Sequence, residues 1–254
     1  MRIDLNADVG ESFGAYTLGN DPALMASITS ANIAAGFHAG DPSVLRATIR
    51  LARAHGVAIG AHPGFPDLAG FGRRDLHVTP REAEDFILYQ IAAVAGVAAA
   101  EGAALGHVKA HGALFNMAAR DRLLADALAR AVAIFDRSLR LFAPPDSEIV
   151  NAARALGVPV AIEVFADRAY EPDGRLASRL KSGAVIHDVA TVVARAVRFV
   201  ADRTIVAMDG SRLPVDADTM CIHGDTPGSD RLAAAIRAGL EAAVRSADGD
   251  SPSV

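Results

Sequence analysis

Short apolar runs alternate with longer amphipathic runs along the chain. Seven of the apolar runs have the length and composition of strands, and we predict strands at residues 2–6, 31–36, 57–61, 105–110, 139–143, 159–163 and 219–223. Runs with helical spacing follow them, at residues 41–56, 79–102, 120–135, 147–156, 187–201 and 229–246. Strands that alternate with helices are typical of an α/β fold with a parallel sheet.

Two of the predicted helices begin at recognisable capping residues. Asp41 followed by Pro42 places an N-cap before a proline at the first helical position, so we interpret Asp41 as a helix cap only. Thr79 and Glu82 have the spacing of a capping box.

Polar residues share one face of two predicted strands. Asp4 and Asn6 alternate with apolar residues, and Asp8 follows in the same phase; Lys109 and His111 repeat this pattern. A flat parallel sheet covered by helices would be apolar on both faces, whereas a barrel that opens onto a site accepts polar inner residues. We therefore favour a parallel (β/α)7 TIM-like barrel over an open doubly wound sheet. The barrel would be a single domain at residues 1–246, followed by a flexible tail at residues 247–254.

The composition narrows the range of partners. The chain has 254 residues, of which 51% are hydrophobic and 22% charged, as in ordinary globular domains. Its net charge of −5 argues against nucleic acid or an anionic membrane as a partner, and we find no apolar run long enough to span a bilayer. The first residues have no signal-peptide pattern, and Cys221 is the only cysteine, so we expect a cytoplasmic protein without an internal disulfide.

Polar and ionisable residues gather at the predicted strand ends. The carboxyl ends of parallel strands converge on one mouth of a barrel, where such folds carry their sites. Any single residue there could serve only to cap a helix or a turn, but chance would not place five of the eight histidines at strand ends. The set comprises Asn6, Asp8, Glu11, His38, His62, His107, Lys109, His111, Asn116, Glu163, Asp167, Arg168, His223 and Asp225.

The chemistry of this set stays open. Histidines and carboxylates can ligate zinc or another divalent ion, or can act as general acids and bases. The chain has neither an HExxH motif nor a pair of cysteines, and we assign no metal ligands. Lys109 could bind a carboxylate or phosphate, form a Schiff base, or pair with Glu163; we favour the binding of an anion.

Two long loops, at residues 64–78 and 166–186, have the character of lids or partner surfaces. The first contains Arg73 and Arg74, whose guanidinium groups are suited to anions. The chain has no Walker motif and no GxGxxG motif after a strand. Any ATP chemistry must therefore use a different binding site or another subunit.

Seven ordered motifs together resemble one family. They read DLNADVGE, ANIAAGFHAGDP, GAHPGFPD, GFGRR, VKAHGALFN, EVFADR and CIHGD, and they begin at residues 4, 31, 60, 70, 108, 163 and 221. The chain is similar through them to the LamB/YcsF family, the A subunits of bacterial ATP-dependent 5-oxoprolinase, from residue 1 to about residue 245. It has Ala7 and Ala35 where family members usually have Cys, and Ala110 where they have Pro, which argues against a catalytic thiol at the first two positions.

The resemblance implies a seven-stranded barrel similar to the glycoside hydrolase/deacetylase superfamily. It also implies the ring opening of 5-oxo-L-proline (pyroglutamate) to L-glutamate, driven by ATP with an accompanying divalent ion such as Mg²⁺, and subunits B and C as partners. We hypothesise that Lys109 and Arg73 hold the substrate carboxylate or a phosphate, and that Asp8, Glu163 or a histidine orients water. The expected catalytic residues are Asp8, His38, His62, Lys109, His111 and Glu163, and the expected substrate- or phosphate-binding residues are Asn6, Glu11, Arg73, Asn116, Arg168, His223 and Asp225.

Two alternatives remain. The first is a metal-dependent deacetylase or amidohydrolase of the same superfamily, which would act without ATP. The second is a non-catalytic subunit that binds the lactam and passes it to a partner. The number of titratable groups on the predicted inner face argues against a pure binding module.

Overall fold

The computed structural model describes residues 3–249 and confirms the predicted barrel. All seven predicted strands are present, with small shifts at their ends. They pair in parallel in the closed order β1-β2-β3-β4-β5-β6-β9, and the ring closes where β1 pairs with β9. The strands are β1 (Asp4–Val9), β2 (Ser30–Ala34), β3 (Ala58–His62), β4 (Leu105–Val108), β5 (Arg140–Ala143), β6 (Val160–Phe165) and β9 (Thr219–Ile222).

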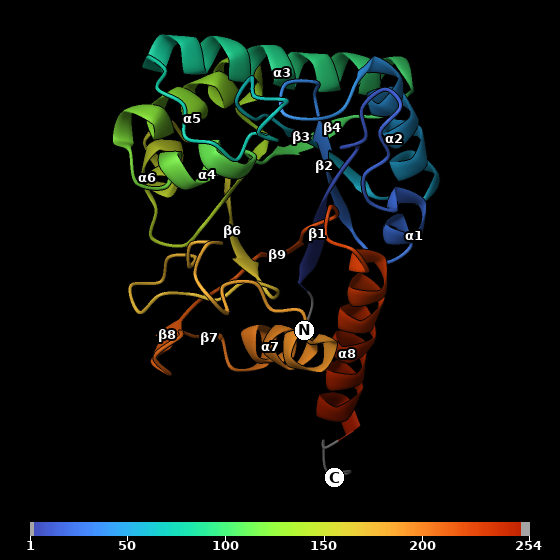
Figure 1. Cartoon of the computed structure of the whole chain (residues 1–254), viewed down its shortest axis with the longest axis vertical. Coiled ribbons are helices and arrows are strands. Elements are labelled where there is room, and N and C mark those ends of the chain that lie inside the picture. The colour runs from blue at the N-terminus through green and yellow to red at the C-terminus, as the bar shows by residue number, and fades with distance from the viewer. Residues whose placement is uncertain (1–2, 250–254) are drawn as a thin grey trace.

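The predicted helices lie outside this ring of strands (Figure 1). They are α2 (Pro42–Ala54), α3 (Pro80–Ala100), α5 (Arg122–Asp136), α6 (Glu148–Ala155), α7 (Val189–Ala201) and α8 (Ser229–Gly249). Both predicted caps are confirmed: the Asp41 side chain accepts from the backbone N–H groups of Ser43 and Val44, and Thr79 forms a reciprocal capping box with Glu82. These caps satisfy amide groups that a helix cannot satisfy internally.

Four short elements have no counterpart in the sequence prediction. They are α1 (Asp21–Met25), α4 (Gly112–Ala118) and the antiparallel pair β7 (Thr204–Val206) and β8 (Arg212–Pro214), which lies between α7 and β9. Elements of three to seven residues are too short for a periodic pattern to reveal. Helix α8 runs to Gly249. The flexible tail at residues 247–254 stays a prediction, because residues 250–254 lie outside the described residues.

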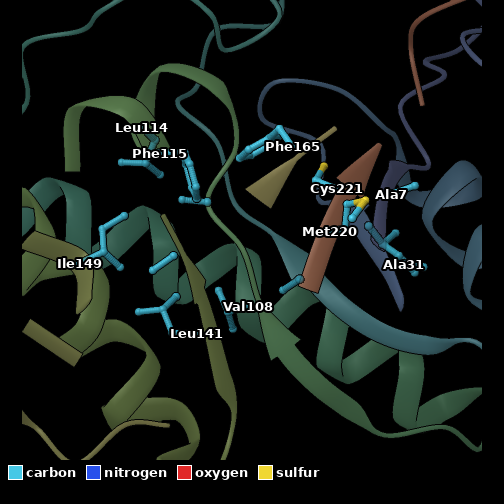
Figure 2. Close-up of a cluster of buried hydrophobic side chains, with 14 of the residues drawn as sticks. Ala7, Ala31, Val108, Leu114, Phe115, Leu141, Ile149, Phe165, Met220 and Cys221 are labelled. Atoms are coloured by element: carbon cyan, nitrogen blue, oxygen red, sulfur yellow. The ribbon is translucent and has the colours of Figure 1, made fainter. Parts of the chain in front are cut away.

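Side chains on the barrel strands alternate between the outer apolar layer and the lumen. On β1, Leu5 and Ala7 belong to the hydrophobic core, while the Asn6 side chain bonds to Thr219 on the neighbouring strand β9 and to Glu163 on β6. Figure 2 shows part of this core, including Ala7, Ala31, Val108, Leu141 and Met220 from five of the strands. The polar lumen explains why the sequence pattern favours a barrel over a flat sheet.

Helix α3 is the one element in the described part of the chain that is long and apolar enough to cross a membrane by length and composition. It packs against α5 and the barrel, with Ile87, Ile91 and Val94 fully buried. A core helix of a folded domain passes the same test, so this helix is weak evidence for a membrane span.

Candidate functional site

The strand ends bring most of the predicted site residues together. Asp8 lies on β1, His62 ends β3, and Glu163 lies on β6; the turns after β2 and β4 add His38 and His111. All five side chains are buried. Ionisable groups are rarely buried without a partner, so the contacts of each one decide what the cluster can do.

Lys109 is the cationic centre of this cluster. Its Nζ donates to Asp8 Oδ1 at 2.9 Å and to Cys221 Sγ at 2.8 Å, and it lies 3.0 Å from Glu163 Oε1. Burial lowers the pKa of Lys109, but its interactions with Asp8, Cys221 and Glu163 outweigh burial and hold the pKa well above its usual value. An amine that stays protonated is no nucleophile, which argues against a Schiff base.

The three protons of the Lys109 ammonium are shared among the acceptors of Asp8, Cys221 and Glu163 and a longer contact with Asn6 Oδ1 at 3.4 Å. The pairing with Glu163, which the sequence left as an alternative to anion binding, is present, and the group has no proton left for a substrate anion in this arrangement. The binding of a carboxylate by Lys109 would require one of these contacts to break.

Asparagine and threonine side chains hold the carboxylates in place. Asn6 Nδ2 donates to Glu163 Oε1 at 3.0 Å and to Thr219 Oγ1 at 2.7 Å. Asn32 Nδ2 donates to Asn6 Oδ1 at 2.7 Å and to Asp8 Oδ1 at 2.9 Å. Asn6, predicted to bind substrate, thus orients the buried Glu163 carboxylate, and Asn32 orients that of Asp8.

Three histidine rings pack around Glu11. The rings of His38 and His111 are stacked with centroids 3.8 Å apart, and His62 meets His111 edge to face. Glu11 Oε1 lies 3.5 Å from His38 Nε2 and 3.7 Å from His111 Nδ1. Gly72 has a φ of +61°, and a Cβ there would lie 2.7 Å from His38 Cβ, so only glycine allows the loop to cover the stacked rings.

The buried carboxylates are held in opposite protonation states. Burial raises the pKa of Asp8, but His62 and Lys109 outweigh it, and the net pKa is well below the usual range. Burial and then the charge of Asp8 raise the pKa of Glu11 well above its usual range. Burial also lowers the pKa of His38 and of His111, so these two imidazoles are uncharged at neutral pH.

A second group of charges forms the rim of the mouth. Arg73 Nη2 bonds to Asp225 Oδ2 at 2.7 Å, and the Arg73 side chain is 34% exposed. His223 Nδ1 lies 2.8 Å from Asp167 Oδ2. Arg179, an exposed residue of the loop after β6, is close enough to interact with Arg73: desolvation and then the charge of Arg73 lower the pKa of Arg179. The rim can therefore attract an anion to the buried cluster.

The side chains of two further residues that were predicted to bind substrate make other contacts. Asn116 is exposed on α4, and its backbone carbonyl accepts from Arg120. The Arg168 guanidinium donates to the carbonyl oxygens of Ala177 and Ala184, so it holds the long loop after β6. A sequence motif places both residues near the mouth but does not say which way the side chains point.

Three residues at the site are not singled out by the sequence analysis. Asn32 has a detectable signal, since Ser30 and Asn32 alternate with apolar residues on β2 as Asp4 and Asn6 do on β1. Cys221 is predicted to form no disulfide and begins the CIHGD motif, but the sequence does not indicate that its thiol contacts Lys109. Arg179 lies in a loop, where no periodicity marks it.

A closed parallel barrel whose strand ends surround buried titratable groups places the chain in the class of TIM-like β/α barrels with a site at the mouth. Within that class, the chain belongs to the LamB/YcsF family, whose model matches residues 3–249. The resemblance found from the motifs is thereby confirmed.

The relatives carry consistent names. A protein of Chloroflexus aggregans, named as the A subunit of 5-oxoprolinase, is 52% identical over 96% of both chains. One of Heliobacterium modesticaldum with the same name is 54% identical, again over 96% of each. A crystal structure of a lactam utilization protein from Thermus thermophilus has a TM-score of 0.92 and 46% identity, and the alignment covers 96% of this chain and 98% of that one. A name that designates one lettered subunit indicates that these relatives work within a multi-subunit complex.

Proposed function

We propose that the chain is the A subunit of an ATP-dependent 5-oxoprolinase, which hydrolyses 5-oxo-L-proline to L-glutamate and ATP to ADP and phosphate. Subunits B and C would be its partners. One observation carries the proposal: the buried network of Asp8, Lys109 and Glu163 lies beneath an arginine-bearing rim, in a chain 52% identical to a protein named as the A subunit.

The reaction explains why ATP is needed. The five-membered lactam is an unactivated amide, which water attacks slowly. Transfer of the γ-phosphoryl group to the carbonyl oxygen releases ADP and makes the ring carbon more electrophilic. One water then adds to that carbon, the ring C–N bond breaks, and the nitrogen takes a proton. A second water hydrolyses the acyl phosphate to give glutamate and phosphate.

Asp8 is the best-placed group to orient the attacking water. Its Oδ1 is engaged by Lys109 and Asn32, while its Oδ2 faces His62 Nε2 at the longer distance of 3.4 Å. The pKa of Asp8 lies well below its usual range because His62 and Lys109 overcome the effect of burial, so the carboxylate is ionised at neutral pH. An ionised, fixed carboxylate beside the reacting carbon accepts a hydrogen bond from water.

The rim suits the anionic parts of the reactants. Arg73 keeps exposed N–H groups in addition to its contact with Asp225, and Arg179 lies near it. The substrate carries a carboxylate and ATP carries phosphates, and guanidinium groups bind both in bidentate fashion. Since Lys109 is already saturated, Arg73 takes the anion-binding role that the sequence analysis divides between the two.

The experiment is a reconstitution with and without this chain. Glutamate release and ADP formation from 5-oxo-L-proline and ATP are measured for the three subunits together and for B and C alone. We expect glutamate only from the complete set. If B and C alone release glutamate at the full rate, this chain does not open the ring and the proposal fails.

The metal-dependent alternative is favoured by one observation, the group of Glu11, His38, His62 and His111, whose ligand atoms lie within 4.8 Å of one another. This alternative is distinguished from the ATP-dependent reaction by incubating the chain alone with 5-oxo-L-proline and divalent ions but no ATP. Glutamate release in that arm would identify an ATP-independent amidohydrolase. We expect none.

A further inference from the structure

His62 and His111 face each other through one ring nitrogen each. His62 Nδ1 lies 2.7 Å from the carbonyl oxygen of Lys109, and His111 Nε2 lies 2.8 Å from that of Phe71. A carbonyl oxygen only accepts, so each of these nitrogens must carry the proton of its ring. If both rings are uncharged, the other two nitrogens, His62 Nε2 and His111 Nδ1, are both acceptors, yet they lie 3.0 Å apart.

Neighbouring buried polar atoms also lack hydrogen-bond partners. Among the described residues, Glu11 Oε1 and both ring nitrogens of His38 have no hydrogen-bond partner, although Glu11 is 6% and His38 0% exposed. Buried polar atoms without partners are costly, and several in one place need an explanation. A proton shared by His62 and His111 would relieve that pair but would leave Glu11 and His38 unchanged.

The distances fit a single cation. Four ligands about 2.1 Å from a tetrahedral ion would lie roughly 3.4 Å from one another. Glu11 Oε1 lies 3.5 Å from His38 Nε2 and 3.7 Å from His111 Nδ1, and the facing histidine nitrogens are 3.0 Å apart. One ligand atom from each of the four side chains lies within 4.8 Å of the others.

The surroundings are also those of a metal site. Backbone carbonyls fix the tautomers of His62 and His111, which is how metal-binding imidazoles are usually oriented. Asp8 lies 3.4 Å from His62 Nε2 and adds negative charge. Lys109 and Arg73 oppose a cation, but Lys109 is paired with Asp8 and Glu163, and Arg73 with Asp225.

We infer that Glu11, His38, His62 and His111 bind one first-row transition-metal ion of the zinc type. Three imidazoles and one carboxylate suit such an ion better than Mg²⁺, which prefers oxygen ligands, so this ion is distinct from one that accompanies ATP. In the mouth it would supply a Lewis acid beside the reacting carbonyl. The inference reverses the assignment of no metal ligands from the sequence, and it does not depend on the identity of the substrate.

The test uses the purified full-length chain without substrate or partner subunits. After removal of metals with a chelator, Zn²⁺ is titrated by calorimetry in millimolar Mg²⁺, and Co²⁺ is titrated while visible absorption is recorded. We expect one ion per chain, and we expect the bound Co²⁺ to show the visible d–d absorption bands typical of a four-coordinate site. Glu11→Gln and His38→Gln should each weaken Zn²⁺ binding by at least about 100-fold.

Two control variants separate the site from other histidines. His55→Gln changes an exposed ring at the end of α2, and His107→Gln changes a buried ring that bonds to Asn32 outside the cluster. Both should keep the wild-type affinity. The inference is overturned if no ion binds at micromolar Zn²⁺, or if Glu11→Gln, a nearly isosteric change checked for folding by circular dichroism, binds it unchanged. Neither outcome bears on glutamate release, so the proposed reaction is tested separately.

Discussion

Asp8 and Glu11 are two carboxylates at the same strand end, and their neighbours give them different charge states. Asp8 has Lys109 and His62 beside it, which keep its pKa well below the usual range despite burial. Burial raises the pKa of Glu11, and the negative charge of Asp8 raises it further. A divalent ion at Glu11 would supply positive charge and ionise it, since a bound ion becomes the largest local charge.

His107 makes stability depend on pH. Burial lowers its pKa from 6.5 to about 4, a shift that corresponds to about 3 kcal/mol. Because the folded-state pKa is the lower one, the unfolded chain binds more protons between these values. The contribution of the uncharged His107 ring to the free energy of unfolding is fully present above pH 6.5 and is lost as the pH falls toward 4.

We therefore expect His107→Gln to flatten the decline of unfolding free energy between pH 6.5 and pH 4. Glutamine keeps a donor for Asn32 Oδ1, with which the His107 ring bonds at 2.8 Å. Urea unfolding at several pH values measures the slope. The exposed variant His55→Gln should retain the wild-type slope; equal slopes for His107→Gln and wild type would refute this explanation.

Arg73 is predicted to act in binding more than in chemistry. Arg73→Ala removes the exposed guanidinium group at the rim, and we expect KM for 5-oxo-L-proline or ATP to rise by about 10-fold or more, with a smaller change in kcat. Steady-state kinetics of the reconstituted complex measure both. Arg203→Ala, at an exposed ion pair with Asp216, is the matched control. A fall in kcat at unchanged KM would contradict the binding role.

At the scale of elements, the loop after β6 is held by arginine side chains and has few strand contacts. Arg168 donates to the carbonyls of Ala177 and Ala184, and Arg195 donates to those of Ala166 and Arg168. These charged donors add to the few backbone bonds of the loop, such as the one from the Ala169 N–H to the Ala184 carbonyl. The sequence predicts a lid or a partner surface here, and these contacts give the loop a defined conformation at the mouth.

Arg168→Lys should loosen this loop. Lysine keeps the charge but lacks the planar fork that reaches two carbonyls, and the loss should cost about 1–3 kcal/mol. We expect a Tm lower by a few degrees and faster proteolysis within residues 166–186, measured by calorimetry and by mass spectrometry of the fragments. Arg175→Lys, at an exposed pair with Asp173 in the same loop, should change neither. An unchanged Tm in Arg168→Lys would show that the bonds are dispensable.

Elements with a periodic pattern are predictable from the sequence, and contacts between elements are not. The barrel strands and the capped helices follow from alternation and from Asp41 and Thr79. The site residues are found as a set because strand ends converge. Three features depend on contacts between strands and loops. They are the engagement of all the Lys109 protons, the bonds of Arg168 to loop carbonyls and the close approach of the ring nitrogens of His62 and His111. A linear sequence carries no pattern for these.

At the scale of the whole molecule, the barrel places its partly exposed charges and its buried charges at different depths. The rim carries the partly exposed pair of Arg73 and Asp225, while Asp8, Lys109 and Glu163 are buried below it. A reactant held by its anionic groups at the rim would place its ring toward the buried carboxylates. Water exclusion at that depth strengthens each electrostatic contact.

The central claim is that ring opening occurs at this mouth with Asp8 orienting the water. The most direct measurement is the kcat for glutamate release by the three-subunit complex containing Asp8→Asn, compared with one containing Asp126→Asn, which alters a salt-bridged carboxylate on α5. We predict that Asp8→Asn lowers kcat by about 10²–10⁴-fold while Asp126→Asn leaves it unchanged. Full activity of the folded Asp8→Asn complex would contradict the account.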